Sequence, residues 1–241
     1  MLSNVNSYNL VIYSDEESCR PLTKYLSNPR IRLIVKPYEE FYGYRYKDDW
    51  IKNHETNDLM NRTVDWKVNM LWSEKIHFVD QTIREQYFNS EFYGWCDIGY
   101  FRATPRDLSV DELKNWGSTV AIRKLQKDKI YYALVNNDDE YINAAYRRIN
   151  DKNEHGLPKM PTPAFQISIA GGFFVCHRDN IDWWKRVYDE KLRLYFQHGY
   201  LVKDDQHIIL DCVFSNSSRF FLCRENNPAY DNWFLFQRFL R

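Results

Sequence analysis

The chain has few residues that break regular structure, and it has no excess charge of either sign. Eight Gly and eight Pro occur in 241 residues, about half of their average combined share of ~12%. This scarcity excludes collagen-like and low-complexity chains, and a hydrophobic content of 44% excludes a disordered one. The 33 Lys and Arg balance the 33 Asp and Glu, whereas nucleic-acid-binding domains usually carry a basic excess. We therefore expect a globular protein without a nucleic acid partner.

Signals for membrane insertion and secretion are also missing. No stretch approaches the ~18 consecutive apolar residues of a transmembrane helix, and the first residues have neither the basic region nor the apolar run of a signal peptide. The five cysteines are odd in number and form no Cys-x-x-Cys pair, so we expect free thiols in a reducing compartment. These features predict a cytoplasmic protein without a transmembrane segment, and they leave peripheral membrane contact open.

The motifs of several large enzyme classes are absent. The sequence has no Gly-x-Gly-x-x-Gly turn, no Gly-Lys-Thr phosphate loop and no Gly-x-Ser-x-Gly elbow. Dehydrogenase, kinase and α/β-hydrolase activities therefore have no support. The six histidines have no recognisable metal-ligand spacing, so any chemistry has to come from other residues.

Short apolar runs alternate with helical patterns along the chain. The runs predict strands at 9–13, 31–36, 92–96, 119–122, 130–135, 165–176 and 219–223. Helices are expected at 14–26, from 63 onward, at 138–149 and after 179 and 204, with a loop at 151–163. This alternation implies an α/β fold with a mainly parallel sheet flanked by helices. No linker divides the chain, so residues 1–241 are expected to form a single domain.

The first candidate site follows the apolar run at 92–96. A buried strand that ends in Asp97 places this carboxylate at the carboxyl edge of the sheet, where open α/β folds bind ligands. Gly99 lets the chain turn, and Arg102 offers a fork of donors to a phosphate or a carboxylate. The alternative is an ordinary turn in which Asp97 accepts hydrogen bonds from its own backbone.

Two glycines and a lysine form a second set of candidates. Gly171 and Gly172 lie inside the longest apolar run, and bare backbone there can approach a polyhydroxyl ligand closely. The alternative is tight packing of a helix against the strand. Lys75, on the polar side of the helix predicted from 63 onward, is either a solvated lysine or a phosphate ligand.

A pair of adjacent acids is the third candidate. Asp204 and Asp205 precede a helical pattern, and acids in this position usually cap the helix and interact with its dipole. The alternative is a catalytic or metal-binding carboxylate held at the positive end of the helix. The residues alone leave both interpretations open.

Taken in order, these segments resemble the bacterial HtrL/YibB family of glycosyltransferases, also called WlaTC-like. The matching segments are Tyr8-Asn-Leu-Val-Ile-Tyr-Ser-Asp15, Trp72-Ser-Glu-Lys75, Phe92-Tyr-Gly-Trp-Cys-Asp-Ile-Gly-Tyr-Phe-Arg102, Ile169-Ala-Gly-Gly-Phe-Phe174 and Asp204-Asp205-Gln206. The same order is more distantly similar to nucleotide-sugar transferases of the GT-A fold, and to glycogenin-like enzymes in particular. The resemblance therefore implies a GT-A-like fold.

The resemblance also implies a role for each segment. In such transferases an acidic motif after a strand holds Mn²⁺ or Mg²⁺ and the sugar nucleotide, and Asp97 stands at that position as the expected metal ligand. A later glycine-containing strand binds the sugar, which assigns Gly171 and Gly172 to the sugar pocket. An Asp-Gln helix start lies at the reacting centre, which assigns Asp205 and Gln206 to catalysis.

Two departures from the family pattern accompany these roles. Gly99 stands where such transferases carry a second acidic residue. The chain also starts at what resembles their second strand, so the first nucleotide-binding strand is expected to be missing. Lys75, Gly99 and Arg102 complete the expected donor-binding set together with Asp97 and the two glycines.

We therefore expect a glycosyltransferase that moves a sugar from a nucleotide-sugar donor to a hydroxyl of a glycan or lipid-linked acceptor. The alternative is a catalytically inactive glycan- or nucleotide-binding module derived from the same fold. A third interpretation is a structural or interaction protein without a small-molecule site. Stabilisation by a nucleoside diphosphate would separate the first two from the third, because a ligand that binds only the folded state raises its stability.

Overall fold

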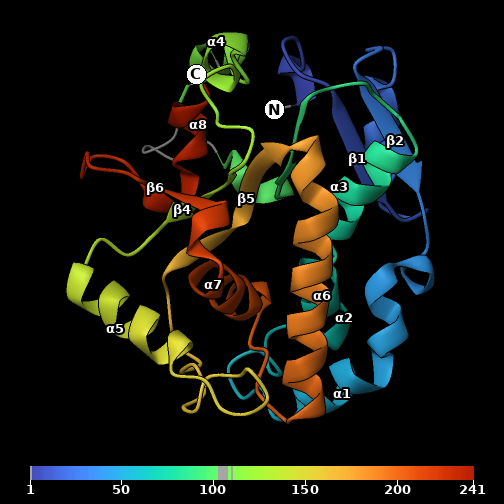
Figure 1. Cartoon of the computed structure of the whole chain (residues 1–241). Coiled ribbons are helices and arrows are strands. Elements are labelled where there is room, and N and C mark those ends of the chain that lie inside the picture. The colour runs from blue at the N-terminus through green and yellow to red at the C-terminus, as the bar shows by residue number, and fades with distance from the viewer. Residues whose placement is uncertain (1, 103–107, 110) are drawn as a thin grey trace.

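A mixed four-stranded sheet lies at the centre of the α/β fold (Figure 1). The computed structural model describes residues 2–102, 108–109 and 111–241. The strands run in the order β3-β5-β4-β6, with bounds Phe92–Cys96 for β3, Ile130–Leu134 for β4, Ile169–His177 for β5 and Phe220–Arg224 for β6.

The direction of β5 differs from the expected mainly parallel arrangement. β4 and β6 are parallel, but β5 runs antiparallel to both β3 and β4. The chain enters β5 beside the end of β4, where the Val135 amide donates to the Ser168 carbonyl at 2.7 Å. The sequence pattern misses this reversal because a run of apolar side chains is the same in both strand directions.

Two further strands form a separate parallel pair near the N-terminus, namely β1 (Leu10–Ser14) and β2 (Ile31–Val35). A short 3₁₀ helix at Arg20–Tyr25 connects them, in place of the helix expected at 14–26. The pair lies beside helix α3 in Figure 1, and the ring of Tyr13 stacks on that of Phe78 at 4.4 Å. β1 is thereby attached to α3 rather than to the central sheet.

Eight α-helices occur among the described residues, and most of them pack around the sheet. Their bounds are Lys47–Glu55 (α1), Trp66–Ser73 (α2), Lys75–Arg84 (α3), Thr119–Ile122 (α4), Asp139–Asn150 (α5), Ile181–Gln197 (α6), Asp205–Ser215 (α7) and Phe236–Phe239 (α8). The strand predicted at 119–122 is therefore wrong, because this segment forms α4. Val120 is 66% exposed there, so the segment has β-branched residues but does not enter the sheet.

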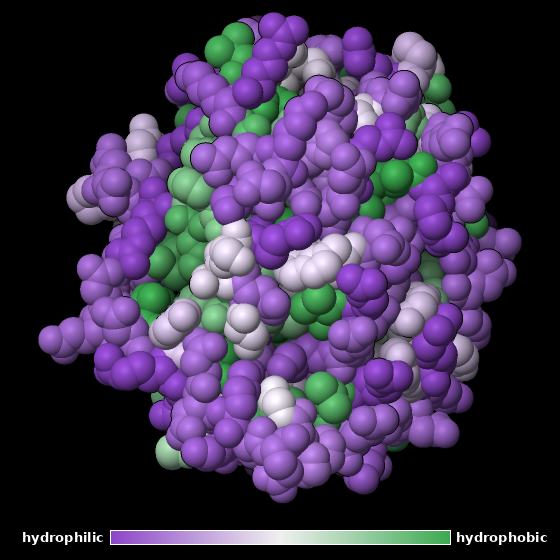
Figure 2. Space-filling model, viewed as in Figure 1, coloured by the Kyte–Doolittle hydropathy of each residue, from purple (hydrophilic) through white to green (hydrophobic). Residues whose placement is uncertain are grey.

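Helix α6 shows how sequence periodicity fixes the packing of a helix. Its buried side chains recur every three or four residues and comprise Ile181, Trp184, Tyr188, Leu192 and Tyr195. Its exposed positions are all polar and comprise Asp182, Arg186, Glu190, Arg193 and Gln197. This outer side of α6 faces the viewer in Figure 1, and Figure 2 shows the same face as largely hydrophilic, with smaller apolar patches.

Apolar side chains cover both faces of the sheet. In β5, Phe174 and Cys176 belong to the core formed with α6 and α7, whereas Phe173 and Val175 belong to a second core beside α8. This two-sided burial accounts for the long apolar run in the sequence. In the part of the chain that the structure describes, no helix has the length and hydrophobicity needed to cross a bilayer.

Candidate active site

The candidate site begins with an irregularity in β5. Ile130, Tyr131 and Tyr132 pair in register with β5, and continuing that register would place Leu134 opposite Gly172. Leu134 instead faces Ile169, so β5 carries three extra residues at this point. Extra residues of this kind redirect a strand and are common beside active sites. The irregularity contains Gly171 and frees its carbonyl from the ladder with β4.

Asp97 lies where β3 ends, next to this irregular part of β5. Its backbone amide donates to the Gly172 carbonyl at 2.9 Å. A Cβ on Gly172 would lie 3.4 Å from Asp97 Oδ2, and the Asp97 side chain is 36% exposed. The indole N–H of Trp95 donates to the Oδ1 atom of Asp97. The structure therefore brings Asp97 and Gly172 together at the carboxyl end of β3.

Lys75, the first residue of α3, connects three parts of the site. Its Nζ donates to the Gly171 carbonyl at 2.9 Å and to Asp205 Oδ2 at 2.9 Å. It also lies 3.3 Å from Asp97 Oδ1, and its side chain is only 8% exposed. Lys75 is therefore not a solvated lysine, because its ammonium is buried among oxygens of the site.

The two adjacent acids at the start of α7 have different environments. Asp204 caps the helix, accepting from the Gln206 amide at 3.1 Å, and pairs with Lys203 at 2.8 Å. Asp205 points its buried carboxylate at β5, where a Cβ on Gly171 would lie 2.6 Å from Asp205 Oδ2. A side chain at position 171 would displace this carboxylate, which explains the glycine. The Gln206 side chain is partly exposed and lines the cleft described below.

Burial dominates the electrostatics of Asp205 and Lys75. Loss of solvent raises the pKa of Asp205 to about 6, partly offset by attraction to Lys75 and reinforced by repulsion from Asp204 and Asp97. Burial opposes the charge of Lys75, but the attraction of Asp205 and Asp97 outweighs it, so the pKa of Lys75 is raised. Lys75 therefore remains an ammonium near neutral pH, whereas the raised pKa of Asp205 lies about one unit below neutral pH.

A cleft of about 430 Å³ opens over these residues. All eight residues predicted for the site line it, namely Lys75, Asp97, Gly99, Arg102, Gly171, Gly172, Asp205 and Gln206. Arg102 donates from Nε to the Gly99 carbonyl at 2.8 Å, and its guanidinium lies 5.3 Å from the ring centre of Phe234. The Arg102 guanidinium is therefore held at the cleft, where it is a candidate donor to a ligand.

Sequence reasoning missed the aromatic walls of this cleft. Trp72, Tyr100, Trp233 and Phe234 line it as well. Trp72 lies in α2, three residues before Lys75, and its place in the matching segment Trp72–Lys75 was the signal available for it. Nothing in the sequence indicates that 233–234, more than 130 residues after Asp97, returns to the same cleft.

Three buried asparagines hold the segment that leads into α7, and sequence reasoning missed them too. Asn53, in α1, exchanges two hydrogen bonds with the backbone of Val202, at 2.8 and 2.9 Å. Asn57 and Asn69 both donate to the Lys203 carbonyl at 3.0 Å. These bonds fix the backbone directly before the Asp204–Asp205 pair, so α1 and α2 help to position the site.

The surroundings of Asp97, the expected metal ligand, are short of further metal-binding side chains. Within the described ranges, no group of three or more His, Cys, Asp or Glu side chains is placed to hold a metal ion. The Lys75 ammonium lies 3.3 Å from Asp97 Oδ1 and 2.9 Å from Asp205 Oδ2. A cation already lies between the two carboxylates, so these residues do not fit a divalent ion at Asp97.

Comparisons with known proteins give one family match. A model described as "Bacterial protein of unknown function (HtrL_YibB)" matches residues 39–241. This range includes α3, β3, β5 and α7, which supply most of the cleft. Neither the curated proteins nor the solved structures contain a match to the chain.

Proposed function

The chain belongs to the HtrL_YibB family of bacterial proteins, as its sequence segments predict, and from the geometry of its cleft we propose a function. We propose that it is a glycosyltransferase with a GT-A-like fold. It transfers a sugar from a nucleotide-sugar donor to a hydroxyl of a glycan or of a lipid-linked acceptor. The family description assigns no activity, so the proposal depends on the cleft.

One observation carries the proposal, namely the convergence of four distant segments on one cleft. Asp97 follows β3, Gly171 and Gly172 lie in β5, Asp205 opens α7 and Lys75 opens α3. These are the positions to which the resemblance gives roles in binding and transferring a sugar nucleotide. The cleft volume of about 430 Å³ lies within the usual range for small-molecule sites, roughly 300–1,000 Å³.

Different lining residues are suited to different roles in a transfer reaction. The Arg102 guanidinium is suited to the departing diphosphate, because a preorganised fork of donors stabilises negative charge as it develops. Bare backbone at Gly172 leaves room for the sugar ring. Asp205 is the proposed general base for the acceptor hydroxyl, since its pKa of about 6 keeps it ionised near neutral pH yet basic enough to take a proton. Gln206 is proposed to contact the reacting sugar.

A second candidate function is favoured by the charges and rings of the cleft. In the described part of the lining, four aspartates (Asp97, Asp204, Asp205 and Asp231) face two cations, and Trp72 and Trp233 form part of the walls. Carboxylates accept hydrogen bonds from hydroxyls, and aromatic faces offer apolar area to a sugar ring. A neutral glycan therefore fits this lining, as an inactive glycan-binding module would require.

The location and partners proposed from the sequence are retained with this function. The five cysteines are all free thiols, which supports a reducing compartment and hence a cytoplasmic location. A nucleotide-sugar donor and a glycan or lipid-linked acceptor are the proposed partners. A lipid-linked acceptor would bring the protein to a membrane surface without a transmembrane segment.

A paired binding and hydrolysis screen tests the two candidates. Nucleotide sugars, nucleoside diphosphates and oligosaccharides are each added in a thermal-shift assay, and nucleotide sugars are also assayed for slow hydrolysis. A transferase gives stabilisation by one nucleoside diphosphate and hydrolysis of its sugar conjugate, because a ligand specific to the folded state raises Tm. Stabilisation by oligosaccharides alone favours the binding module. No response to any of them contradicts both.

A further inference from the structure

We propose that this site operates without a divalent cation, because Lys75 is a built-in cation that occupies the place between Asp97 and Asp205. The inference deepens the proposed transferase and in that respect rests on it. It predicts that the protein without a donor has no metal site. This prediction can be tested whether or not the protein transfers a sugar.

The Lys75 ammonium donates to three oxygen atoms. They are Asp205 Oδ2 at 2.9 Å, the Gly171 carbonyl at 2.9 Å and Asp97 Oδ2 at 3.4 Å. A lysine ammonium has three N–H donors, so these acceptors use its full capacity. Carboxylate and carbonyl oxygens are also the ligands that Mg²⁺ and Mn²⁺ prefer. The oxygens that a divalent ion would need are thus already bound by the side chain.

Burial keeps this arrangement in place. The side chains of Lys75 and Asp205 are 8% and 5% exposed, so neither can turn to water without moving the backbone. A buried charge that loses its partner is strongly destabilising. Lys75 also starts α3 directly after Glu74, whose carboxylate accepts from the amides of Tyr42 and Gly43 at 2.7 and 2.8 Å. The helix start that carries Lys75 is therefore anchored on its other side.

The second oxygen of Asp97 is also engaged. Its Oδ1 atom accepts from the indole N–H of Trp95, which is fixed in β3 two residues earlier. A divalent ion at Asp97 would therefore compete with an indole donor on one side and an ammonium on the other. Gly99 adds no carboxylate where the related pattern has one. The site therefore presents one acid and one fixed cation at this position.

If no metal is bound, another cation has to bind the donor phosphates. Lys75 lines the cleft, but its three N–H donors are already used by oxygens of the protein. Arg102 is the other cation of the described lining, and its Nε donates to the Gly99 carbonyl at 2.8 Å. We therefore assign recognition of a nucleoside diphosphate to the Arg102 guanidinium, with no metal bridge.

Titration with Mn²⁺, followed by electron paramagnetic resonance, tests the inference on the protein without donor. The wild-type chain is expected to show no saturable binding. The Lys75→Ala variant is expected to gain a site with Kd on the order of 10⁻⁴–10⁻³ M, typical of weak oxygen-ligand sites, because it frees the three oxygens. That gain should disappear in the Lys75→Ala/Asp97→Asn double variant. Lys203→Ala, which removes the lysine paired with Asp204, is the matched control and should gain no site.

A donor-binding arm separates this inference from the proposed function. A nucleoside diphosphate is titrated into the wild type in EDTA and again in Mn²⁺, and we expect equal affinity in the two buffers. In Arg102→Ala we expect the affinity to fall at least tenfold, since one charge-assisted phosphate contact is worth about that much. Saturable Mn²⁺ binding by the wild type that is lost in Asp97→Asn overturns the inference, even if Lys75→Ala fails to fold. If no nucleotide binds in either buffer, the proposed function fails, while the Mn²⁺ titration still decides the role of Lys75.

Discussion

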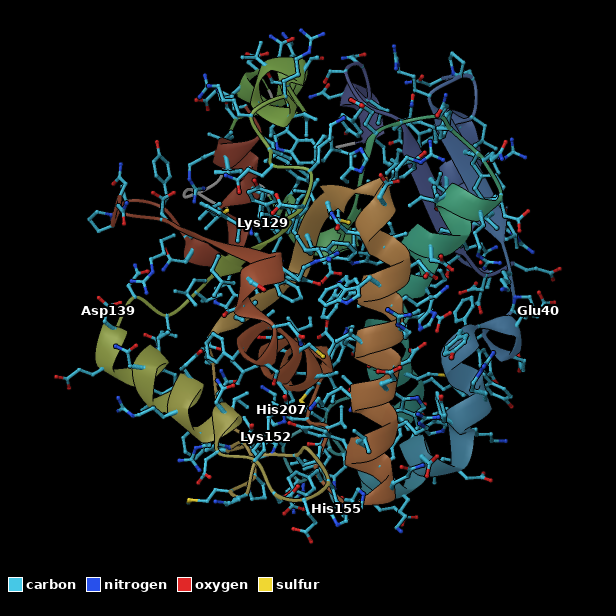
Figure 3. All side chains as sticks on the ribbon, in the orientation of Figure 1. Glu40, Lys129, Asp139, Lys152, His155 and His207 are labelled. Atoms are coloured by element: carbon cyan, nitrogen blue, oxygen red, sulfur yellow. The ribbon has the colours of Figure 1, made fainter. Side chains whose placement is uncertain are left out.

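Helix α7 carries two buried aspartates, and each meets lysine on a different side of the helix. Asp205 shares Lys75 with Asp97, so two carboxylates face one ammonium. Asp211, whose side chain is fully buried, meets two ammonium groups, Lys152 at 2.6 Å and Lys191 at 3.2 Å. Figure 3 labels Lys152 close to α7 at the lower side of the molecule. The first cluster has a formal charge of −1 and the second of +1.

The two clusters differ in how completely their aspartate is satisfied. Asp211 also accepts from the hydroxyls of Tyr195 and Ser215, at 3.0 and 2.9 Å, and it does not line the cleft. Among the described residues, the Asp205 side chain accepts a hydrogen bond from Lys75 alone, and it lines the cleft. Burial raises the pKa of Asp205, whereas at the second cluster burial lowers the pKa of Lys152. A buried ion pair therefore marks a candidate site where its carboxylate lines a cleft and can still accept hydrogen bonds from a ligand.

Replacing each aspartate by asparagine gives the sharpest contrast and the largest expected effect. Asp205→Asn should lower turnover by ~10²–10⁴, because a lost general base typically has that effect. Asp211→Asn should leave the rate per folded molecule within a factor of a few, but destabilise the fold by ~3–5 kcal/mol, because it breaks a buried pair. Steady-state rates beside melting curves check both. Equal losses of rate in the two variants would mean that Asp205 acts only through the fold.

The two glycines of β5 provide a second contrast, with an intermediate effect. A Cβ at Gly171 would lie 2.6 Å from Asp205 Oδ2, whereas one at Gly172 would lie 3.4 Å from Asp97 Oδ2. Gly171→Ala should therefore lower the free energy of unfolding by ~1–3 kcal/mol, as overpacking does. Gly172→Ala should change it by less than ~1 kcal/mol while weakening donor binding. Chemical denaturation measures the change in stability, and ligand titration measures the change in donor binding. A larger loss of stability in Gly172→Ala than in Gly171→Ala would contradict the close approach of Asp205 to Gly171.

The raised pKa of Asp205 predicts how stability depends on pH. Between its ordinary value of 3.8 and about 6, the folded state binds a proton that the unfolded state has released. The contribution of this group to the free energy of unfolding therefore falls as pH rises through that window, by up to ~3 kcal/mol, and is constant above it. Subtracting the pH profile of Asp205→Asn from that of the wild type isolates the contribution. A difference that rises with pH over this window would contradict the assignment.

The cap of α7 provides the smallest expected effect. Asn caps a helix about as well as Asp, so Asp204→Asn should retain the bond from the Gln206 amide and lose the pair with Lys203. We expect the free energy of unfolding to fall by ~1 kcal/mol, including a dipole contribution of ~0.3–1 kcal/mol. Thermal melts measure it. A loss as large as that of Asp211→Asn would place Asp204 among the essential buried charges instead.

How far the sequence predicts this structure differs between its elements. β3 and β4 match the apolar runs at 92–96 and 130–135 to within a residue, because turn-forming residues bound both runs. The α4 segment was misassigned because Thr, Val and Ile favour strands only when a neighbouring strand can pair with them. The three extra residues of β5 have no sequence signal apart from the two glycines.

The candidate site was predictable as a set of residues but not as an arrangement. The sequence pattern made Asp97, Gly172 and Asp205 candidates, the resemblance to a family gave them roles, and the structure places them around one cleft. Sequence could not show that Lys75 joins them, because this contact depends on how closely α3 and α7 approach β5. It also could not separate Asp204 from Asp205, since both acids precede the helix and only their side-chain directions distinguish cap from cleft.

The most direct test of the account is a crystal structure of the protein with the nucleotide that stabilises it, grown in the presence of Mn²⁺. The account predicts the diphosphate on the Arg102 guanidinium, the sugar side of the ligand beside Gly172, and the Lys75 ammonium still between Asp97 and Asp205. A nucleotide bound away from this cleft would contradict the proposed function. A metal ion held by Asp97 with Lys75 displaced would contradict the assignment of Lys75 as the cation of the site.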